Sequence, residues 1–481
     1  MKFGLALLFV CIGASAQQLS TVERAKVDGV MEKVYRDTGV PSVVAGIYRG
    51  DQVIYARALG SARLPADGKA AAQQALPADA TMAYPIGSIS KQFTATCVLL
   101  LQERGVLKLD DPVSRWFPEF TRAQDVTLRN LLTHTSGYSD YAPQDYTIPA
   151  WTKPIDSYKL IREWATKPLD FEPGTRAEYS NTNFQMAALI VAKASGMGFH
   201  DFLWANVITP LKLQGVLDLD ADQAKVQPLG YERHAAGPMR HAILEAAGWY
   251  TGDGNLAMPV ATLLMWDASI LHRTLLKPES YDVMETEYKL KDGSGAGFGL
   301  GVEVMLLAPG LHMVYHSGEV GGFVSENDMV LEQNIAFAAL TNIEGPGAGT
   351  VTRAFGRALV QQPAAAATSA KAAPPTVVRK PRFDAKPAAQ ATTILAGMSS
   401  GTINRTLFTA DANAYFNAET LGDFHDSLQT LGAAKIQQTS EESRGGMLYR
   451  LYRVEYASKK FDLSTYTTPQ GKLEQFLLYP R

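Results

Sequence analysis

The strand-like segments of this chain of 481 residues fall into two groups, which a long and mostly helical stretch separates. Residues 42–48 and 52–59 are rich in β-branched residues and predict a hairpin that turns at Gly50-Asp51. The second group comprises four predicted strands, at 298–307, 311–316, 323–331 and 334–341. Because the strands do not alternate regularly with helices, this order favours an antiparallel sheet with packed helices over a parallel doubly wound sheet.

Helices are predicted at both ends of this region. The segment that starts at Ser20 with Glu23 three residues later is a capping box, so a helix is expected to run to Thr38 and stop at Gly39. Residues 88–104 carry a helical apolar stripe, and residues 350–360 predict a closing helix. Residues 110–280 combine short helices with loops rich in Pro and Gly.

Composition divides the chain into four parts. Residues 1–16 have a basic start, an apolar run and a small-residue site ending at Ala16, as is typical of a signal peptide. Residues 17–360 form the expected main domain, and residues 361–390 are an Ala- and Pro-rich linker. Residues 391–481 predict a small α+β accessory domain. We therefore expect an exported protein, periplasmic or secreted, with no transmembrane segment in the mature chain.

The net charge argues against one class of function, and the cysteine content excludes one kind of stabilising bond. A formal net charge of −3 argues against a protein that binds nucleic acid through bulk positive charge. Cleavage near Ala16 would leave Cys97 as the single thiol, so the fold cannot depend on an internal disulfide.

Ser88-Ile89-Ser90-Lys91 is the only Ser-x-x-Lys sequence in the chain, and it lies at the start of a predicted helix. Residues three apart share a helix face, so Lys91 can reach the Ser88 hydroxyl. Unpaired amides and the helix dipole at this end favour developing negative charge. Burial can lower a lysine pKa far enough for the amine to act as a base. The alternative is a capping serine beside a solvated lysine.

Two further short motifs can bring polar groups to a cleft. Tyr179 and Asn181 lie two residues apart on a predicted loop, where a phenol can act as a base and an amide can hold a substrate carbonyl. His316-Ser317-Gly318 ends a predicted strand, and Gly318 permits close approach of a substrate backbone. Either motif alone also fits an ordinary turn.

Taken together, the three motifs resemble the class C β-lactamase and penicillin-binding-protein-like serine hydrolases, which include esterases and D-amino-acid peptidases. The resemblance covers about residues 20–360 and includes several connecting segments. These are Leu131-Leu132-Thr133-His134-Thr135-Ser136-Gly137, Glu172-Pro173-Gly174, Phe298-Gly299-Leu300-Gly301 and His316-Ser317-Gly318-Glu319. The resemblance implies an α/β fold of the α+β type, with a β-lactamase/transpeptidase-like antiparallel sheet, flanking helices and a mostly helical subdomain.

The resemblance also implies a role for each motif residue. Ser88 would be the acylated nucleophile, and Lys91 would assist it and keep Tyr179 ionised. Tyr179 would take the serine proton and later activate water. Asn181 would orient the substrate, and His316 and Gly318 would line the binding strand. The amides of Ser88 and Glu319 would form the oxyanion hole.

This chain departs from the β-lactamases at the third motif, which is usually Lys-Thr-Gly. No Lys-Ser-Gly or Lys-Thr-Gly occurs here, and His316 stands at the lysine position. Since a histidine is mostly neutral near pH 7, an anionic β-lactam should be held less well.

The sequence therefore predicts a serine hydrolase that forms an acyl-enzyme on Ser88 and cleaves an ester or amide, without a metal or cofactor. Its expected partner is a small-molecule or peptide substrate, which could derive from the cell wall. The alternatives are a true β-lactamase or penicillin-binding carboxypeptidase, and a catalytically silent binding protein on the same fold.

Two other patterns offer weaker sites. Gly397-Met398-Ser399-Ser400-Gly401 matches Gly-x-Ser-x-Gly, which makes Ser399 a rival nucleophile if a strand precedes it and a helix follows. His312 and His316 have metal-ligand spacing, but the sequence supplies no clear third ligand.

Overall fold

The computed structural model describes residues 18–65, 75–345, 347–361 and 383–481. The predicted signal peptide and residues 362–382 of the predicted linker lie outside these ranges. No helix in the described part of the chain has the length and apolar character that crossing a bilayer requires.

A seven-stranded sheet in the order β3-β2-β1-β12-β11-β10-β9 forms the centre of the larger domain. The two predicted strand groups meet where β1 pairs antiparallel with β12, with Val43 opposite Thr341. The predicted antiparallel sheet is therefore confirmed. Its strands are β1 (Ser42–Arg49), β2 (Gln52–Arg63), β3 (Leu76–Pro77), β9 (Glu303–Ala308), β10 (Leu311–Val320), β11 (Phe323–Val330) and β12 (Ile335–Thr341).

Strand β9 begins later than the predicted start at residue 298. Gly297 and Gly301 have φ angles of 77° and 70°. Such left-handed backbone interrupts an extended strand, and glycine adopts it without a side-chain penalty. The segment before Glu303 is therefore a turn.

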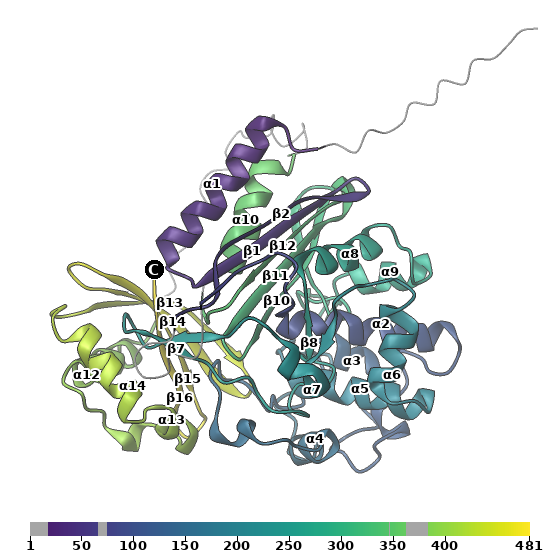
Figure 1. Ribbon diagram of the computed structural model, residues 1–481. Coiled ribbons are helices and arrows are strands. Elements are labelled where there is room, and N and C mark those ends of the chain that lie inside the picture. Colours follow the sequence, from purple (N-terminus) through teal and green to yellow (C-terminus); the bar gives the residue numbers. More distant parts are fainter. Residues whose placement is uncertain (1–17, 66–74, 346, 362–382) are drawn as a thin grey trace, which may run out of the picture.

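Helices cover both faces of this sheet (Figure 1). The predicted capping box opens α1 (Thr21–Thr38), which packs with α10 (Ala348–Leu359) on one face. On the other face, α8 (Val260–Leu271) contacts β1, β2, β11 and β12. The helix α2 (Ser90–Glu103) joins this layer through Phe93, whose ring stacks on Trp266 at a centroid distance of 3.9 Å.

The middle of the chain forms the predicted, mostly helical subdomain beside α2. Its helices are α3 (Leu128–Leu132), α4 (Ser157–Ala165), α5 (Asn181–Ser195), α6 (Phe199–Leu203), α7 (Leu219–Asp222) and α9 (Pro278–Glu285). Its short strands are β4 (Tyr84–Pro85), β5 (Leu217–Asp218), β6 (Tyr231–Arg233), β7 (Met239–His241) and β8 (Leu256–Met258). A large buried cluster joins α2, α5 and α8, so the helical subdomain and the sheet share one core.

The chain ends in a small domain with its own sheet in the order β13-β14-β15-β16 and its own core. Its strands are β13 (Lys435–Arg444), β14 (Met447–Glu455), β15 (Lys460–Thr467) and β16 (Leu473–Pro480). Its helices are α12 (Ala385–Ser399), α13 (Ala410–Tyr415) and α14 (Ala418–Leu428).

Two features of this domain differ from the sequence predictions. The expected boundary at residue 391 falls inside α12, which begins at Ala385. Asp384 caps this helix, and Pro387 lies in its first turn, where proline is tolerated. Strand β13 was not among the predicted strands, because Lys435–Arg444 is too polar to show an apolar alternation.

The small domain packs directly against the larger one. The Arg240 guanidinium pairs with Asp423 at 2.7 Å, and the Tyr146 hydroxyl donates to the Glu474 carbonyl at 2.8 Å. The amide nitrogen of Gly446 donates to Glu178 at 2.7 Å. The Gly446 contact holds the turn between β13 and β14 against the loop that precedes α5, and the other two contacts fix α14 and β16.

Candidate active site

Ser88 lies in a short 3-10 turn, Gly87–Ile89, immediately before α2. Lys91 follows on the first turn of α2, where it is fully buried. Its Nζ donates to the Ser88 Oγ at 2.9 Å. The three-residue spacing thus produces the contact that the sequence predicts, although Ser88 stands in the turn before the helix.

Lys91 is enclosed by acceptors as well as by apolar side chains. Its Nζ also donates to the Asn181 Oδ1 and to the Asp253 carbonyl, both at 2.7 Å. Burial lowers the pKa of Lys91 to about 8, while nearby Asp253 and Asp140 oppose this shift. A substantial fraction of the amine is therefore neutral at mildly alkaline pH, where it can accept a proton.

Tyr179 lies on the loop before α5 and faces Lys91 and Ser88. The Lys91 Nζ lies 4.9 Å from the centre of the Tyr179 ring. Burial raises the pKa of Tyr179 well above 10, although a hydrogen bond with Ser88 opposes this effect. This direction favours the protonated phenol, whereas the family resemblance implies a phenolate.

The segment around His134 supports the Tyr179 loop from behind. The His134 ring stacks on Tyr179 at a centroid distance of 4.3 Å, and its Nδ1 accepts from the Ser180 amide at 3.1 Å. Its carbonyl accepts from the Glu178 amide at 2.9 Å. The conspicuous Leu-Leu-Thr-His-Thr-Ser-Gly sequence thus positions the phenol rather than contributing a reacting group.

Strand β10 carries the third motif, His316-Ser317-Gly318, past the turn that holds Ser88. A Cβ added at Gly318 would lie 1.9 Å from the Ile86 carbonyl oxygen, and one at Gly87 would lie 2.6 Å from the Glu319 amide nitrogen. Only glycine allows two backbones to approach so closely. This contact brings the Glu319 amide to the turn that carries Ser88, where the predicted oxyanion hole requires it.

His316 is only 2% exposed, and its Nδ1 lies 2.5 Å from the Ser317 carbonyl oxygen. Burial lowers its pKa to about 3, and the nearby Lys91 charge lowers it further. His316 is consequently neutral over the working pH range. It cannot replace the cation of a Lys-Thr-Gly motif.

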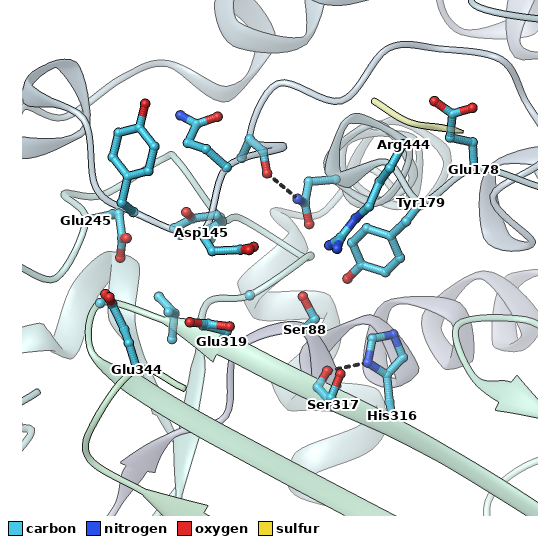
Figure 2. A pocket seen from close by; sticks show the side chains of 18 of the residues that line it. Ser88, Asp145, Glu178, Tyr179, Glu245, His316, Ser317, Glu319, Glu344 and Arg444 are labelled. Carbon is cyan, nitrogen blue, oxygen red and sulfur yellow. Dashed lines mark hydrogen bonds between the residues drawn. The ribbon is translucent and has the colours of Figure 1, made fainter. Parts of the chain in front are cut away.

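These residues line a cavity of about 460 Å³ (Figure 2). Ser88, Tyr179, Asn181, His316 and Glu319 all border it. Lys91 lies behind Ser88, and Gly318 supports the wall without lining it. The structure therefore brings all seven predicted site residues to one place.

The sequence reasoning missed the contribution of the C-terminal domain. Glu442, Ser443 and Arg444 at the end of β13 also line the cavity. The Arg444 side chain reaches toward Tyr179 (Figure 2). The adjacent Gly445-Gly446 turn, with φ angles of 59° and 70°, was the available signal for a hairpin. Nothing in the sequence indicated where that hairpin would point.

The family model for Beta-lactamase matches residues 23–362. The chain belongs to the beta-lactamase family. Members similar to this chain include penicillin-binding protein 4* of Bacillus subtilis, 25% identical over 61% of this chain and 66% of its own. Esterase EstB of Burkholderia gladioli is 31% identical over 40% of this chain and 50% of its own. A D-aminopeptidase of Gluconobacter oxydans is 26% identical over 57% of this chain and 52% of its own.

The matched regions span roughly half to two thirds of these relatives. A solved structure, the octameric penicillin-binding protein homologue from Pyrococcus abyssi, matches with a TM-score of 0.60 at 20% identity. That match covers 95% of this chain and 99% of the other. The predicted β-lactamase/transpeptidase-like fold is thereby confirmed.

The rival sites do not have the geometry that their motifs require. Ser399 ends helix α12, and its Oγ donates to the Leu395 carbonyl at 2.9 Å. A nucleophile elbow instead needs a strand before the serine. His312 is bonded to Glu332 at 2.5 Å, and the described residues contain no group of three potential metal ligands.

Proposed function

We propose that the chain is a serine hydrolase that forms an acyl-enzyme on Ser88 and cleaves an ester or amide. The observation that carries this proposal is the 2.9 Å contact between the buried Lys91 amine and the Ser88 hydroxyl. A serine is a weak nucleophile until an adjacent base takes its proton. A lysine whose pKa is about 8 meets that need.

In the acylation step, neutral Lys91 takes the Ser88 proton as Oγ bonds to the substrate carbonyl carbon. The amides of Ser88 and Glu319 receive the resulting oxyanion. The tetrahedral intermediate then collapses, the bond to the leaving alcohol or amine breaks, and the leaving group takes a proton through the Tyr179 hydroxyl. Lys91 returns its proton to Tyr179, which restores both groups.

In the deacylation step, a water molecule gives its proton to Lys91 and attacks the ester carbonyl of the acyl-enzyme. The bond to Ser88 breaks as Lys91 gives that proton to Oγ, and the carboxylic acid leaves, which restores the neutral amine and the serine hydroxyl. Asn181 accepts from Lys91 at 2.7 Å and donates to Asp140 at 3.3 Å. We assign it the role of aiming the amine as well as bordering the substrate.

The charge of the cavity favours an esterase or D-amino-acid peptidase activity over efficient β-lactam hydrolysis. His316 carries no positive charge near neutral pH, because its pKa is about 3. Esterase and D-aminopeptidase relatives support this assignment. A penicillin-binding carboxypeptidase or β-lactamase is the second candidate, because Arg444 could hold a substrate carboxylate.

We further propose that residues 1–16 direct export and are removed near Ala16. We also propose a main domain at 17–360 and an accessory domain after the linker. Given the helix at Ala385, the accessory domain would begin earlier than residue 391. A substrate derived from the cell wall would fit this location.

The test compares hydrolysis of p-nitrophenyl acetate and of D-alanine p-nitroanilide by the wild type, Ser88→Ala and Ser399→Ala. We expect Ser88→Ala to lose at least about a thousandfold in kcat/KM, as removal of a nucleophile typically does, while Ser399→Ala stays near wild type. Activity that survives Ser88→Ala would overturn the proposal. A folded wild type that turns over neither substrate would favour the silent binding protein.

A further inference from the structure

The cavity beside Ser88 is lined by many more acidic than basic residues. Its acidic residues are Asp145, Glu178, Glu245, Glu303, Glu319, Glu344 and Glu442, and the basic residue among the described lining residues is Arg444. Fixed charges in a cleft with protein walls raise the local concentration of ions of the opposite sign. The cavity as a whole therefore favours cations.

Some of these carboxylates already have partners. Glu178 pairs with Arg176 at 3.0 Å and accepts from the Gly446 amide. Asp145 accepts from the side-chain amide of Gln475 at 2.8 Å. By contrast, no described lysine, arginine or histidine forms an ion pair with Glu245, Glu319 or Glu344. Among the described residues, these three glutamates of the cavity therefore have no ion-pair partner.

Glu245 is the most deeply placed of the three. It is 8% exposed, and its Oε1 accepts from the Thr147 hydroxyl at 3.0 Å. Its Oε2 is buried and has no partner in the described structure. A buried oxygen left without a hydrogen bond is costly, so this atom marks a place for a donor from a ligand.

Glu245 and its acidic neighbours lie across the nucleophile from Arg444 (Figure 2). Figure 2 shows Glu245, Glu319, Glu344 and Asp145 gathered on one side of Ser88, whereas Arg444 and Tyr179 lie on the other. Glu319 also carries the amide assigned to the oxyanion hole, so its side chain extends from the reacting centre toward this group. A substrate held at Ser88 would thus reach the acidic end directly.

We infer that Glu245, Glu319 and Glu344 form a subsite for a primary ammonium group of the substrate. This inference rests on the proposed hydrolase function and adds the charge of its substrate class. An ammonium group supplies three donors and a positive charge, which matches the unpartnered Oε2 and its two neighbouring carboxylates.

The electrostatics of the three glutamates agree with this assignment. Desolvation in the cavity raises the pKa of Glu245 to about 7 and that of Glu319 to about 8; neighbouring carboxylates add to the second shift and Arg444 opposes it, so both groups are partly protonated near neutral pH and a bound cation would favour their ionised forms. Burial and the surrounding carboxylates also raise the pKa of Glu344. A bound cation would relieve both the repulsion and the lack of a counter-charge.

Binding to the Ser88→Ala protein tests the subsite without any turnover. The probes are benzylammonium chloride and its neutral counterpart benzyl alcohol, and the readout is calorimetry. We expect benzylammonium to bind about tenfold or more tightly than benzyl alcohol, a difference of about 1.4 kcal/mol. Glu245→Gln and Glu344→Gln should each remove most of this preference. Glu163→Gln, an exposed change on α4 outside the cavity, should retain it.

Steady-state rates of hydrolysis then test whether the subsite acts on substrates of the reaction. D-alanine p-nitroanilide, which carries a primary ammonium group, is compared with its N-acetyl form, which does not. We expect the ammonium-bearing substrate to be preferred, and Glu245→Gln to reduce that preference. Equal binding of benzylammonium and benzyl alcohol would overturn the inference. Loss of hydrolysis with intact benzylammonium selectivity would instead overturn only the proposed function.

Discussion

The guanidinium carbon of Arg444 lies 5.8 Å from the centre of the Tyr179 ring. Arg444 ends strand β13 of the small C-terminal sheet, whereas Tyr179 precedes α5 of the larger domain. The same guanidinium lies 5.5 Å from the Tyr449 ring and 5.8 Å from the Tyr466 ring, so two strands of the small domain hold it in place. The accessory domain therefore supplies part of the candidate active site.

Replacing Arg444 should weaken catalysis without unfolding the protein. Arg444→Met removes a half-buried cation whose charge favours ionisation of the Tyr179 hydroxyl when that group gives up its proton, while it keeps much of the side-chain volume. We expect kcat/KM for p-nitrophenyl acetate to fall about tenfold, which corresponds to about 1.4 kcal/mol of barrier.

The matched control is Arg453→Met, an arginine exposed on the neighbouring strand β14 and outside the catalytic cavity. It should keep wild-type kinetics. If both variants, with unchanged circular dichroism, hydrolyse the ester at the wild-type rate, then Arg444 has no part in the reaction.

The pH dependence of kcat/KM should report the Lys91 amine. Burial places its pKa at about 8, and only the neutral form can take the Ser88 proton. Activity should therefore fall about tenfold for each pH unit below that value and level off above it. Glu319 also has a pKa of about 8, so the profile of Glu319→Gln is the control. A flat profile between pH 6 and 9, or a limb that disappears in Glu319→Gln, would contradict the role of Lys91 as the base.

Gly318→Ala should lower activity by displacing the backbone of β10 in the active site. The new Cβ would lie 1.9 Å from the Ile86 carbonyl oxygen, so β10 must move away from the turn that carries Ser88. Displacing the Glu319 amide should lower kcat by about a hundredfold or more, as loss of an oxyanion donor does. Gly29→Ala on α1 meets no atom within 4 Å and should leave the rate unchanged. Full activity in Gly318→Ala would show that this contact does not shape the oxyanion hole.

The stability of the protein should decrease as pH rises, in part because of Glu245. Its pKa of about 7 lies above the ordinary 4.5, so the folded chain holds this proton more tightly than the unfolded chain. Its contribution to the free energy of unfolding is complete below pH 4.5 and is lost as pH rises through 7. We expect Tm to fall between pH 5 and pH 8, and Glu245→Gln to reduce that fall, as measured by scanning calorimetry. Identical falls in both proteins would exclude this role for Glu245.

Much of the larger domain could be predicted from local patterns. Neighbouring residues alone indicate the Ser20 capping box, the hairpin around Gly50 and the later strands. The structure confirms these predictions. The Ser88 and Lys91 contact was predictable for the same reason, because a three-residue spacing across the start of a helix brings the two side chains together, even though Ser88 lies in the turn before α2.

The remainder depends on contacts between distant parts of the chain. Arg444 reaches the cavity only because the β13–β14 turn docks on Glu178, and no local pattern encodes that docking. Likewise, the raised pKa of Glu245 and its unpartnered Oε2 result from burial, which no sequence motif indicates. The raised pKa of Tyr179 also follows from its surroundings in the fold, which the sequence does not reveal.

The most direct test of the account is the intact mass of the protein after brief exposure to p-nitrophenyl acetate and, separately, to benzylpenicillin. We predict that the wild type gains one acetyl group, located by peptide mapping at Ser88, and that Ser88→Ala gains none. The reaction with the anionic penicillin should be much slower. An acetyl group that persists in Ser88→Ala, or one that maps to another residue such as Ser399, would contradict the central claim.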